Sequence, residues 1–184
     1  MKVNEELALP WRTASSWSEA LHTLEGLVGR HAKDLGPARK NAEAVRLNLE
    51  IVFPSLDALC RVTCPECPSP CCLEAAVYAD FRDLLFLSLL HLPPPPMQLR
   101  NAPEASCRYH TRHGCALPRI QRPWICTWYL CAAQRAVLER GHEVDRQRLL
   151  STLEAIRSER RAMEDAFLEV VVESMTRRTA PESN

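Results

Sequence analysis

The sequence carries no excess of either charge, because its 184 residues include 23 Lys and Arg and 23 Asp and Glu. Proteins that bind nucleic acid usually carry a basic excess, so this balance argues against that role. Residues 1–16 contain no apolar segment of signal-peptide length. The longest apolar stretch, residues 84–92, is about half as long as a membrane span. We therefore expect a cytoplasmic protein with no membrane contact.

The sequence also lacks internal repeats and any convincing strand pattern, and its apolar residues mostly recur at helical spacing. The length suits one domain with its own core. We predict a single all-α domain over residues 1–184, a small helical bundle with a cysteine-rich metal-binding knot at one end. Its predicted parts are helices within 15–62, a cysteine island at 60–72, a buried helix at 73–91, a cysteine-rich loop at 97–126 and C-terminal helices within 124–178.

Local signals refine these boundaries. Ser16 and Glu19 have the spacing of a capping box at the start of the first helix. Pro54 is expected to end one helix and begin a short one. A long final helix is expected after Asp145, with near-heptad apolar residues interrupted by Arg160. This helix is the predicted contact for a protein partner or a second copy of the chain.

Cysteine is the residue that the sequence has in abundance, with nine in all. Nine is an odd number, which a closed disulfide framework would not leave, and thiols stay reduced in the cytosol. The cysteines are therefore predicted to be metal ligands. They fall into two islands, the first with Cys60, Cys64, Cys67, Cys71 and Cys72, and the second with Cys107, Cys115, Cys126 and Cys131.

Thiolate is a soft ligand that suits zinc, Cu(I) and iron–sulfur clusters. Cys64 and Cys67 have the spacing of a metal-binding knuckle. Vicinal Cys71 and Cys72 tend to point in different directions, so they serve two metals more easily than one. Two four-coordinate sites, or one cluster and one zinc ion, would use eight of the nine thiols. Burial as a small apolar side chain is the alternative for Cys60 and Cys131.

Basic residues surround the second island. Four thiolates around Zn²⁺ or a [4Fe–4S]²⁺ cluster leave two net negative charges, which burial requires to be compensated. Arg108 and Arg122 are the predicted cofactor-binding residues, within a set that also includes Arg100, Arg112 and Arg119. A solvated basic loop is the alternative. His110 and His113 could replace a thiolate in a zinc site with three cysteines and one histidine.

No catalytic constellation emerges from the sequence. Cys60, Cys64 and Cys67 have the CxxxCxxC spacing of radical S-adenosylmethionine enzymes. Those enzymes place this motif after the first strand of a partial barrel, whereas helices are predicted before Cys60. A metalloenzyme would need an acid or base, for which Glu74, Asp80 and Asp83 are candidates. A site with enough cysteines to close every coordination position argues against hydrolysis.

The two islands together resemble the zinc- or iron-chelating cysteine-cluster family (YkgJ-like proteins). Cys64 and Cys67 stand at the CxxC of that family, and Cys71 and Cys72 at its CC pair. The later matches are Cys107, Cys115, Cys126 and Cys131, with Arg122-Pro123 before Cys126. Pro68 replaces the usual glycine, and two spacings are one residue longer than usual, which makes the chain a divergent member. The resemblance implies metal binding, often suggested to be iron–sulfur, without a settled reaction.

These observations lead to two functional expectations. The first is a metal-binding protein that holds an iron–sulfur cluster (4Fe–4S), zinc or both for electron transfer, redox sensing or metal handling. The second is a helical interaction module with a purely structural zinc. A site shared by the islands would place sulfurs from Cys64–Cys72 and from Cys107–Cys131 within bonding distance of a common centre.

Overall fold

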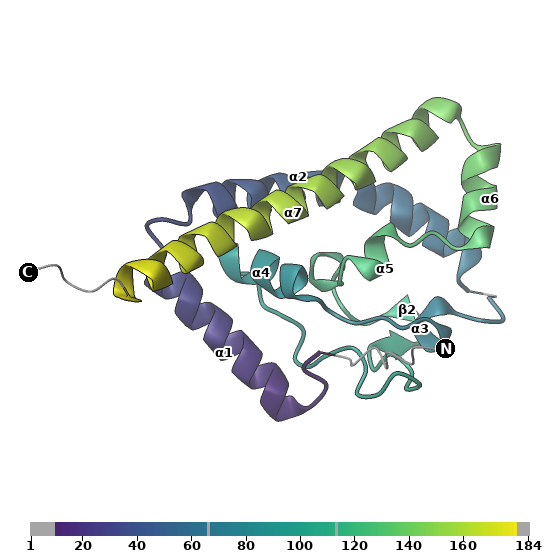
Figure 1. Ribbon diagram of the computed structural model, residues 1–184. Helices are drawn as coiled ribbons and strands as arrows, with labels where there is room; N and C mark the ends of the chain where they lie inside the picture. Colours follow the sequence, from purple (N-terminus) through teal and green to yellow (C-terminus); the bar gives the residue numbers. More distant parts are fainter. Residues whose placement is uncertain (1–9, 66, 113, 180–184) are drawn as a thin grey trace, which may run out of the picture.

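The chain folds mostly into helices, as predicted. The computed structural model describes residues 10–65, 67–112 and 114–179. Figure 1 shows two long helices that lie side by side and carry the smaller elements beneath them. These long helices are α2 (Gly36–Thr63) and α7 (Glu143–Thr179). The side chains of Asn48 and Glu159 join them through a hydrogen bond of 3.0 Å.

Helix α1 (Ala14–Arg30) begins one turn earlier than its predicted cap. Thr13 is the N-cap, and the Thr13 hydroxyl accepts a hydrogen bond from the Ser16 amide while Ser16 Oγ accepts one from the Thr13 amide. The prediction of a Ser16–Glu19 capping box was therefore wrong, because Ser16 takes the third helical position of a box that Thr13 opens. Trp17 is buried on this helix, and its indole N–H donates to the Pro95 carbonyl at 3.2 Å.

Pro54 does not divide α2, contrary to the sequence-based expectation. The helix runs unbroken from Gly36 to Thr63 with Pro54 inside it, and Pro37 lies in its first turn. Proline removes one helical hydrogen bond and is therefore disfavoured in the interior of a helix. Here buried side chains on both sides of Pro54, including Val52 and Leu56, hold the helix against the core. Tertiary packing therefore outweighs the local preference of proline.

The buried helix predicted at 73–91 is in fact two helices with an extended segment between them. Helix α3 spans Cys71–Glu74, and α4 spans Phe81–Leu89. Asp80 and Asp83 form the capping box that begins α4, because each carboxylate accepts the backbone N–H of the other residue. The segment before it is held by Gln98, whose amide bonds both the N–H and the carbonyl of Ala79.

The C-terminal end of α4 is closed by a left-handed residue. His91 has φ +54°, the Leu92 N–H donates to the Leu87 carbonyl, and the His91 N–H donates to the Ser88 carbonyl. This pair of bonds is the Schellman motif, which satisfies carbonyls at a helix end. The prolines from Pro93 onward then prevent the helix from continuing. Burial of α4 between these ends agrees with the predicted central position.

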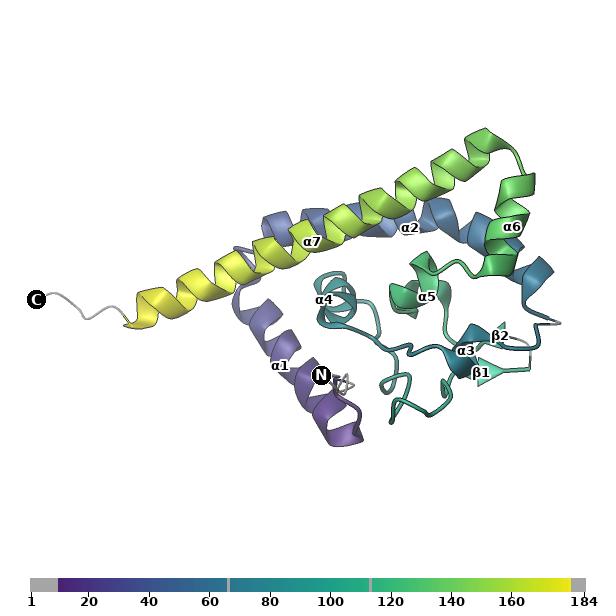
Figure 2. The ribbon, with the colours of Figure 1, turned by 45° about the vertical axis from the view of Figure 1, so that its right-hand side comes forward.

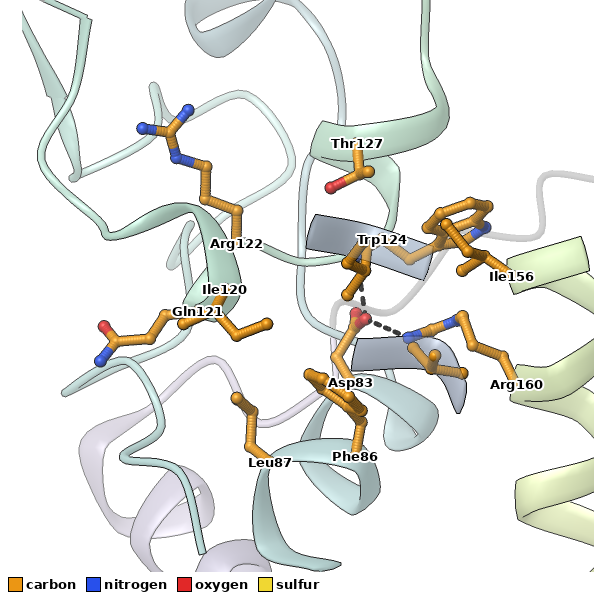
Figure 3. Close-up of a pocket in the computed structure, with 12 residues that line it drawn as sticks. Asp83, Phe86, Leu87, Ile120, Gln121, Arg122, Trp124, Thr127, Ile156 and Arg160 are labelled. Atoms are coloured by element: carbon orange, nitrogen blue, oxygen red, sulfur yellow. Dashed lines mark hydrogen bonds and ion pairs between the residues drawn. The ribbon is translucent and has the colours of Figure 1, made fainter. Parts of the chain in front are cut away.

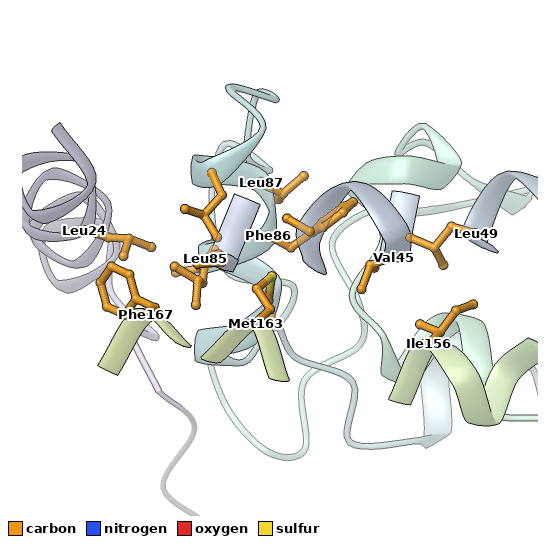
Figure 4. Close-up of a cluster of buried hydrophobic side chains, with 14 of the residues drawn as sticks. Leu24, Val45, Leu49, Leu85, Phe86, Leu87, Ile156, Met163 and Phe167 are labelled. Carbon is orange, nitrogen blue, oxygen red and sulfur yellow. The ribbon is translucent and has the colours of Figure 1, made fainter. Parts of the chain in front are cut away.

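The hydrophobic core lies between α4 and the long helices. Figure 4 shows side chains from α1, α2, α4 and α7 converging there. Ile156 and Met163 of α7 have no exposed surface, and Phe167 is 2% exposed. The ring of Phe81 packs on that of Phe167 with centroids 5.9 Å apart. Helices alone therefore supply most of the apolar burial, and the cysteine islands lie to one side of it.

Residues 97–126, predicted as a loop, contain small regular elements. Strands β1 (His110–Thr111) and β2 (Gly114–Cys115) form an antiparallel hairpin, and η1 (Arg119–Gln121) is a 3₁₀ turn. Gly114 has φ +106°, a conformation that favours glycine. Helices α5 (Ile125–Trp128) and α6 (Ala132–Arg140) then lead to α7. In Figures 1 and 2, α3 and the hairpin lie near each other, on the side of the molecule away from α1.

Helix α7 begins at Glu143, with Asp145 in its first turn. Arg160, which interrupts the apolar spacing, is buried. Leu168, Val172 and Met175 are exposed on the same helix, and the predicted partner or homodimer contact through it stays a prediction. Among the described residues, no helix is both long and apolar enough to cross a bilayer.

Candidate metal centre

The two cysteine islands adjoin through the backbone. The Cys107 N–H donates to the Cys72 carbonyl at 3.0 Å, and the next residue, Arg108, donates its N–H to the Leu99 carbonyl at 2.9 Å. The segment that carries Cys107 therefore lies between Cys72 of the first island on one side and Leu99, earlier in the chain, on the other. Cys107 is the most buried of the cysteines and packs against the hydrophobic core.

Four thiols from the two islands are electrostatic neighbours, and we call Cys72, Cys107, Cys115 and Cys126 the inner thiols. Burial raises the pKa of Cys107 and that of Cys126, and neighbouring sulfurs raise them further. The pKa of Cys72 is raised chiefly by its hydrogen bond with the Cys71 thiol, with smaller contributions from burial, Cys126 and Cys107. Burial and the neighbouring sulfurs therefore favour the protonated form of Cys72, Cys107 and Cys126.

Three further thiols, Cys60, Cys64 and Cys71, gather at the end of α2, and we call them the outer thiols. Burial, and then the charge of Cys60, raise the pKa of Cys64 to about 11. The hydrogen bond from Cys72 lowers the pKa of Cys71 to about 6. The strongest interaction of each thiol of the vicinal pair is the hydrogen bond with the other, while Cys71 also acts on Cys64 and Cys72 is also affected by Cys107 and Cys126 of the second island. The expectation that vicinal cysteines serve different groups stays a prediction.

Cys60 also receives two N–H donors from the second half of the chain. Arg119 Nη2 and Gln134 Nε2 both lie 3.5 Å from its sulfur. Arg119 is in turn paired with Asp57 one helical turn before Cys60. Gln134, on α6, also accepts the Cys131 N–H through its Oε1. The end of α2 is therefore tied to η1 and α6 through a sulfur atom.

The remaining cysteines lie at the margins of these groups. The Cys67 N–H donates to the Cys64 carbonyl in the turn that follows α2. Cys131 precedes α6 and is half-buried. All nine cysteines are free thiols. Within 10–65, 67–112 and 114–179, no three His, Cys, Asp or Glu side chains are arranged to hold a metal ion. Metal binding therefore requires the thiol side chains to turn toward a common point.

Arg100 is the most unusual charged residue beside the inner thiols. Only 2% of its surface is exposed. Its Nη2 donates to the Leu73 carbonyl and its Nη1 to the Pro103 carbonyl, each at 2.8 Å. Its Nε is buried and has no hydrogen-bond partner among the described residues. The Arg100 charge lowers the pKa of Cys107, so the guanidinium lies within electrostatic range of that sulfur. A buried cation and an unpaired donor are what a site for an anionic thiolate centre requires.

The two predicted cofactor-binding arginines lie in different surroundings. Arg122 is half-buried, its Nε donates to the Leu117 carbonyl at 2.9 Å, and its charge lowers the pKa of Cys126. Arg108 is exposed, and its Nη1 lies 3.4 Å from Met97 Sδ. Arg122 is therefore beside an inner thiol. The sulfur atom that Arg108 contacts is that of a methionine and not of a cysteine. The role of Arg108 toward a cofactor stays a prediction.

The histidines of the second island are at the hairpin. The His110 N–H donates to the Cys107 carbonyl at 3.1 Å, and His110 pairs with Cys115 across the two strands. This turn brings the backbone of His110 beside two inner thiols, which is compatible with the proposed Cys107–His110 spacing. His113 lies outside the described residues, so the expectation for it is untested.

Two of the three carboxylates that were candidates for acid–base chemistry, Asp80 and Asp83, have structural partners, and the role of Glu74 stays a prediction. Figure 3 shows Asp83 between Arg160 and Trp124 in a small pocket. Arg160 Nη1 lies 2.8 Å from Asp83 Oδ1, and Arg160 Nη2 lies 3.0 Å from Asp80 Oδ1. The Trp124 N–H donates to Asp83 Oδ1 at 2.9 Å, and the Arg160 guanidinium lies 5.7 Å from the Trp124 ring centroid. We call Asp80, Asp83, Trp124 and Arg160 the clamp.

The clamp determines where Cys126 lies. Trp124 precedes Cys126 by two residues, and the Cys126 N–H donates to the Pro123 carbonyl. Asp83 therefore fixes, through the Trp124 amide, the start of the short helix that carries an inner thiol. Sequence analysis did not anticipate this role for Arg160. A charged residue within an otherwise apolar helical register is a usable signal of a buried ion pair, because burial of arginine without a partner is expensive.

Gln98 is a second positioning residue that sequence analysis did not find. It is 1% exposed, and its amide bonds Ala79, Leu99 and the Pro10 carbonyl. This network fixes the chain just before Arg100 against the segment that follows the first island. No sequence pattern marks it, because a glutamine in an irregular segment is ordinarily exposed.

Asp83 gives a pH-dependence that can be measured. Burial raises the pKa of Asp83 to about 6 from an ordinary value of 3.8, against the lowering effect of Arg160. A carboxyl with a raised pKa in the folded state contributes stability that is present below about pH 4 and lost as the pH rises through about 6. Urea unfolding between these pH values should show a decrease of about 3 kcal/mol in wild type that D83N lacks. Equal slopes for both proteins would contradict this assignment.

No protein-family model, curated protein or solved structure matches the chain. The class of protein must therefore be defined from its own residues. It is a mostly helical protein in which the backbone of Cys107, in the second island, bonds that of Cys72, in the first, near a buried arginine that has no acidic partner among the described residues.

Proposed function

We propose that the protein is a metal-binding protein in which the inner thiols hold one Zn²⁺ ion or one iron–sulfur cluster. The observation that carries the proposal is the buried Arg100, whose Nε has no partner and whose charge acts on Cys107. Burying a guanidinium without an anion is strongly unfavourable. Ionised inner thiols would supply that anion, and they ionise when a metal binds.

The source of the four sulfurs supports the same proposal. Cys72 comes from α3, Cys107 from the segment before the hairpin, Cys115 from β2 and Cys126 from α5. A single ion would therefore cross-link four segments that are otherwise held by few regular hydrogen bonds. On this proposal the cysteine-rich knot is the region around these four thiols, and the chain is a divergent member of the cysteine-cluster family that it resembles.

The chemistry of the centre depends on which group is bound. A cluster would supply a reversible one-electron centre, whereas zinc would supply a cross-link without redox chemistry. The residues of this chain would do the same in either case. The clamp positions Cys126, Gln98 positions the chain before Arg100, and Arg100 and Arg122 bring positive charge to the thiols.

The first test is anaerobic purification of the full chain, followed by metal analysis and a visible absorption spectrum. We expect either about four irons per chain with broad thiolate–iron absorbance, or tightly bound zinc in a colourless protein. Protein with no metal that also fails to take up Zn²⁺ or reconstitute a cluster would contradict the proposal.

Chelation of the same protein separates the proposal from the structural-zinc alternative. Most of the buried core comes from α2, α4 and α7, and Cys107 is the one cysteine among its buried members. We therefore expect metal removal to leave the helical circular dichroism nearly unchanged while residues 97–126 become more susceptible to protease. Loss of all helical signal would instead indicate that metal and fold are inseparable, as in a purely structural zinc domain.

A further inference from the structure

Of the arginines in this part of the fold, some are paired with carboxylates and two are not. Arg119 is paired with Asp57, and Arg160 with Asp80 and Asp83. By contrast, Arg100 bonds only carbonyl oxygens, and so does Arg122, among the contacts of the described residues. These two guanidinium groups therefore bring two positive charges that no acidic side chain in the described part of the chain offsets.

Two positive charges match a particular class of centre. Four thiolates with one divalent ion, or with a [4Fe–4S]²⁺ cluster, leave two net negative charges. We infer that Arg100 and Arg122 are the charge-compensating pair of the inner thiols and set the net charge of the centre that the protein accepts. Arg100 Nε is the donor for a bound sulfur. This inference rests on the proposed function.

The positions of the two arginines agree with separate contributions. Arg100 donates to the Leu73 carbonyl, next to Cys72, and Arg122 donates to the Leu117 carbonyl, two residues after Cys115, so each guanidinium serves a different segment of the inner group. The other ionisable groups that act on these sulfurs are already engaged. Asp83 is paired with Arg160, and the Tyr109 hydroxyl donates to the Met97 carbonyl at 2.9 Å. The pair is thus the local source of compensation.

The test uses the full chain, freed of metal under reducing conditions, and titrated with Co²⁺ and Zn²⁺. The variants are R100M, R100K and R122M, with R82M as a matched control because Arg82 is partly exposed and pairs with Glu164 of α7. We expect R100M and R122M to lower Zn²⁺ affinity about tenfold or more at unchanged stoichiometry. R100K and R82M should remain within about threefold of wild type. The sulfur-to-Co²⁺ charge-transfer band should shift in R100M and stay in place in R82M.

The outcomes separate this inference from the proposed function. Wild type that binds neither ion, and holds no cluster, would overturn both. Wild type that binds, with R100M and R122M within about twofold of it, would overturn the inference alone. R100K as weak as R100M would show that the bonds to Leu73 and Pro103 matter rather than the charge, and would also overturn it. If circular dichroism shows that R100M does not fold, R122M and R100K against R82M decide by the same criteria.

Discussion

R160M is expected to lower the free energy of unfolding by about 3–5 kcal/mol, the range for removing one partner of a buried ion pair. Arg160 is 4% exposed and Asp83 is 7% exposed, so neither charge has compensating water. Methionine fills much of the same volume but leaves Asp83 as an unpaired buried carboxylate. Urea denaturation at pH 7, followed by circular dichroism, measures the loss.

A matched control is present on the same pair of helices. Arg82 of α4 pairs with Glu164 of α7 at 2.6 Å, but its side chain is 39% exposed. Ion pairs near the surface contribute about 1 kcal/mol or less, so R82M should be nearly neutral. The double variant R160M/D83N should lose less than R160M, because it leaves no buried charge at position 83 and the asparagine Oδ1 can still accept the Trp124 N–H. If R160M and R82M cost the same, the clamp does not hold the fold together.

The R160M variant also tests whether the clamp links the stability of the fold to metal binding. Asp83 accepts both the Arg160 guanidinium and the Trp124 amide. Without Arg160 the carboxyl takes up a proton more readily, and its hold on Trp124 weakens. We therefore expect metal affinity to fall together with stability in R160M, through displacement of the segment that carries Cys126. R82M should leave metal affinity unchanged.

Periodicity predicted the helices well because long amphipathic patterns survive any tertiary arrangement. The long helices and the burial of residues 84–89 follow directly from it. Boundaries that depend on competing caps were not predictable. Thr13 and Ser16 can each begin a helix, and Asp80 begins α4 where the apolar pattern continues without interruption. Pro54 shows the opposite case, in which packing overrides a local signal.

For the candidate site, the sequence predicted the kind of ligand chemistry but not the arrangement of the residues. Cysteine density predicts soft-metal ligation whatever the fold, but it does not say which sulfurs adjoin. That depends on contacts between distant segments, such as the bond from Cys107 to Cys72. Arg122 was predicted with Arg108 as a cofactor-binding residue, whereas Arg100 was only one of the wider set of arginines, and its burial and unpaired Nε are visible only in the fold. Arg160 and Gln98 act through residues far away in sequence, which no local pattern records.

Substitution of an inner thiol is expected to have the largest effect on metal binding. C126S should weaken Zn²⁺ affinity by about 100-fold or more, since replacing even the partners of a ligand costs about 10–100-fold. Serine preserves the volume of the buried side chain and replaces the soft ligand with a hard one. C72S and C115S should behave alike, because all three sulfurs belong to one electrostatic group. Competition with a chromophoric chelator measures each affinity.

The outer thiols and Cys131 are the controls that make this test specific. Cys64 follows the last residue of α2, Cys71 begins α3, and both are exposed, while Cys131 precedes α6. If the inner thiols hold the tight centre, then C64S, C71S and C131S should keep a tight Zn²⁺ ion with affinity within about threefold of wild type. Loss of that ion in C64S, with C126S unaffected, would move the centre to the first island alone. Arg100 would then have no anion to explain its burial, because its charge acts on Cys107 in the second island.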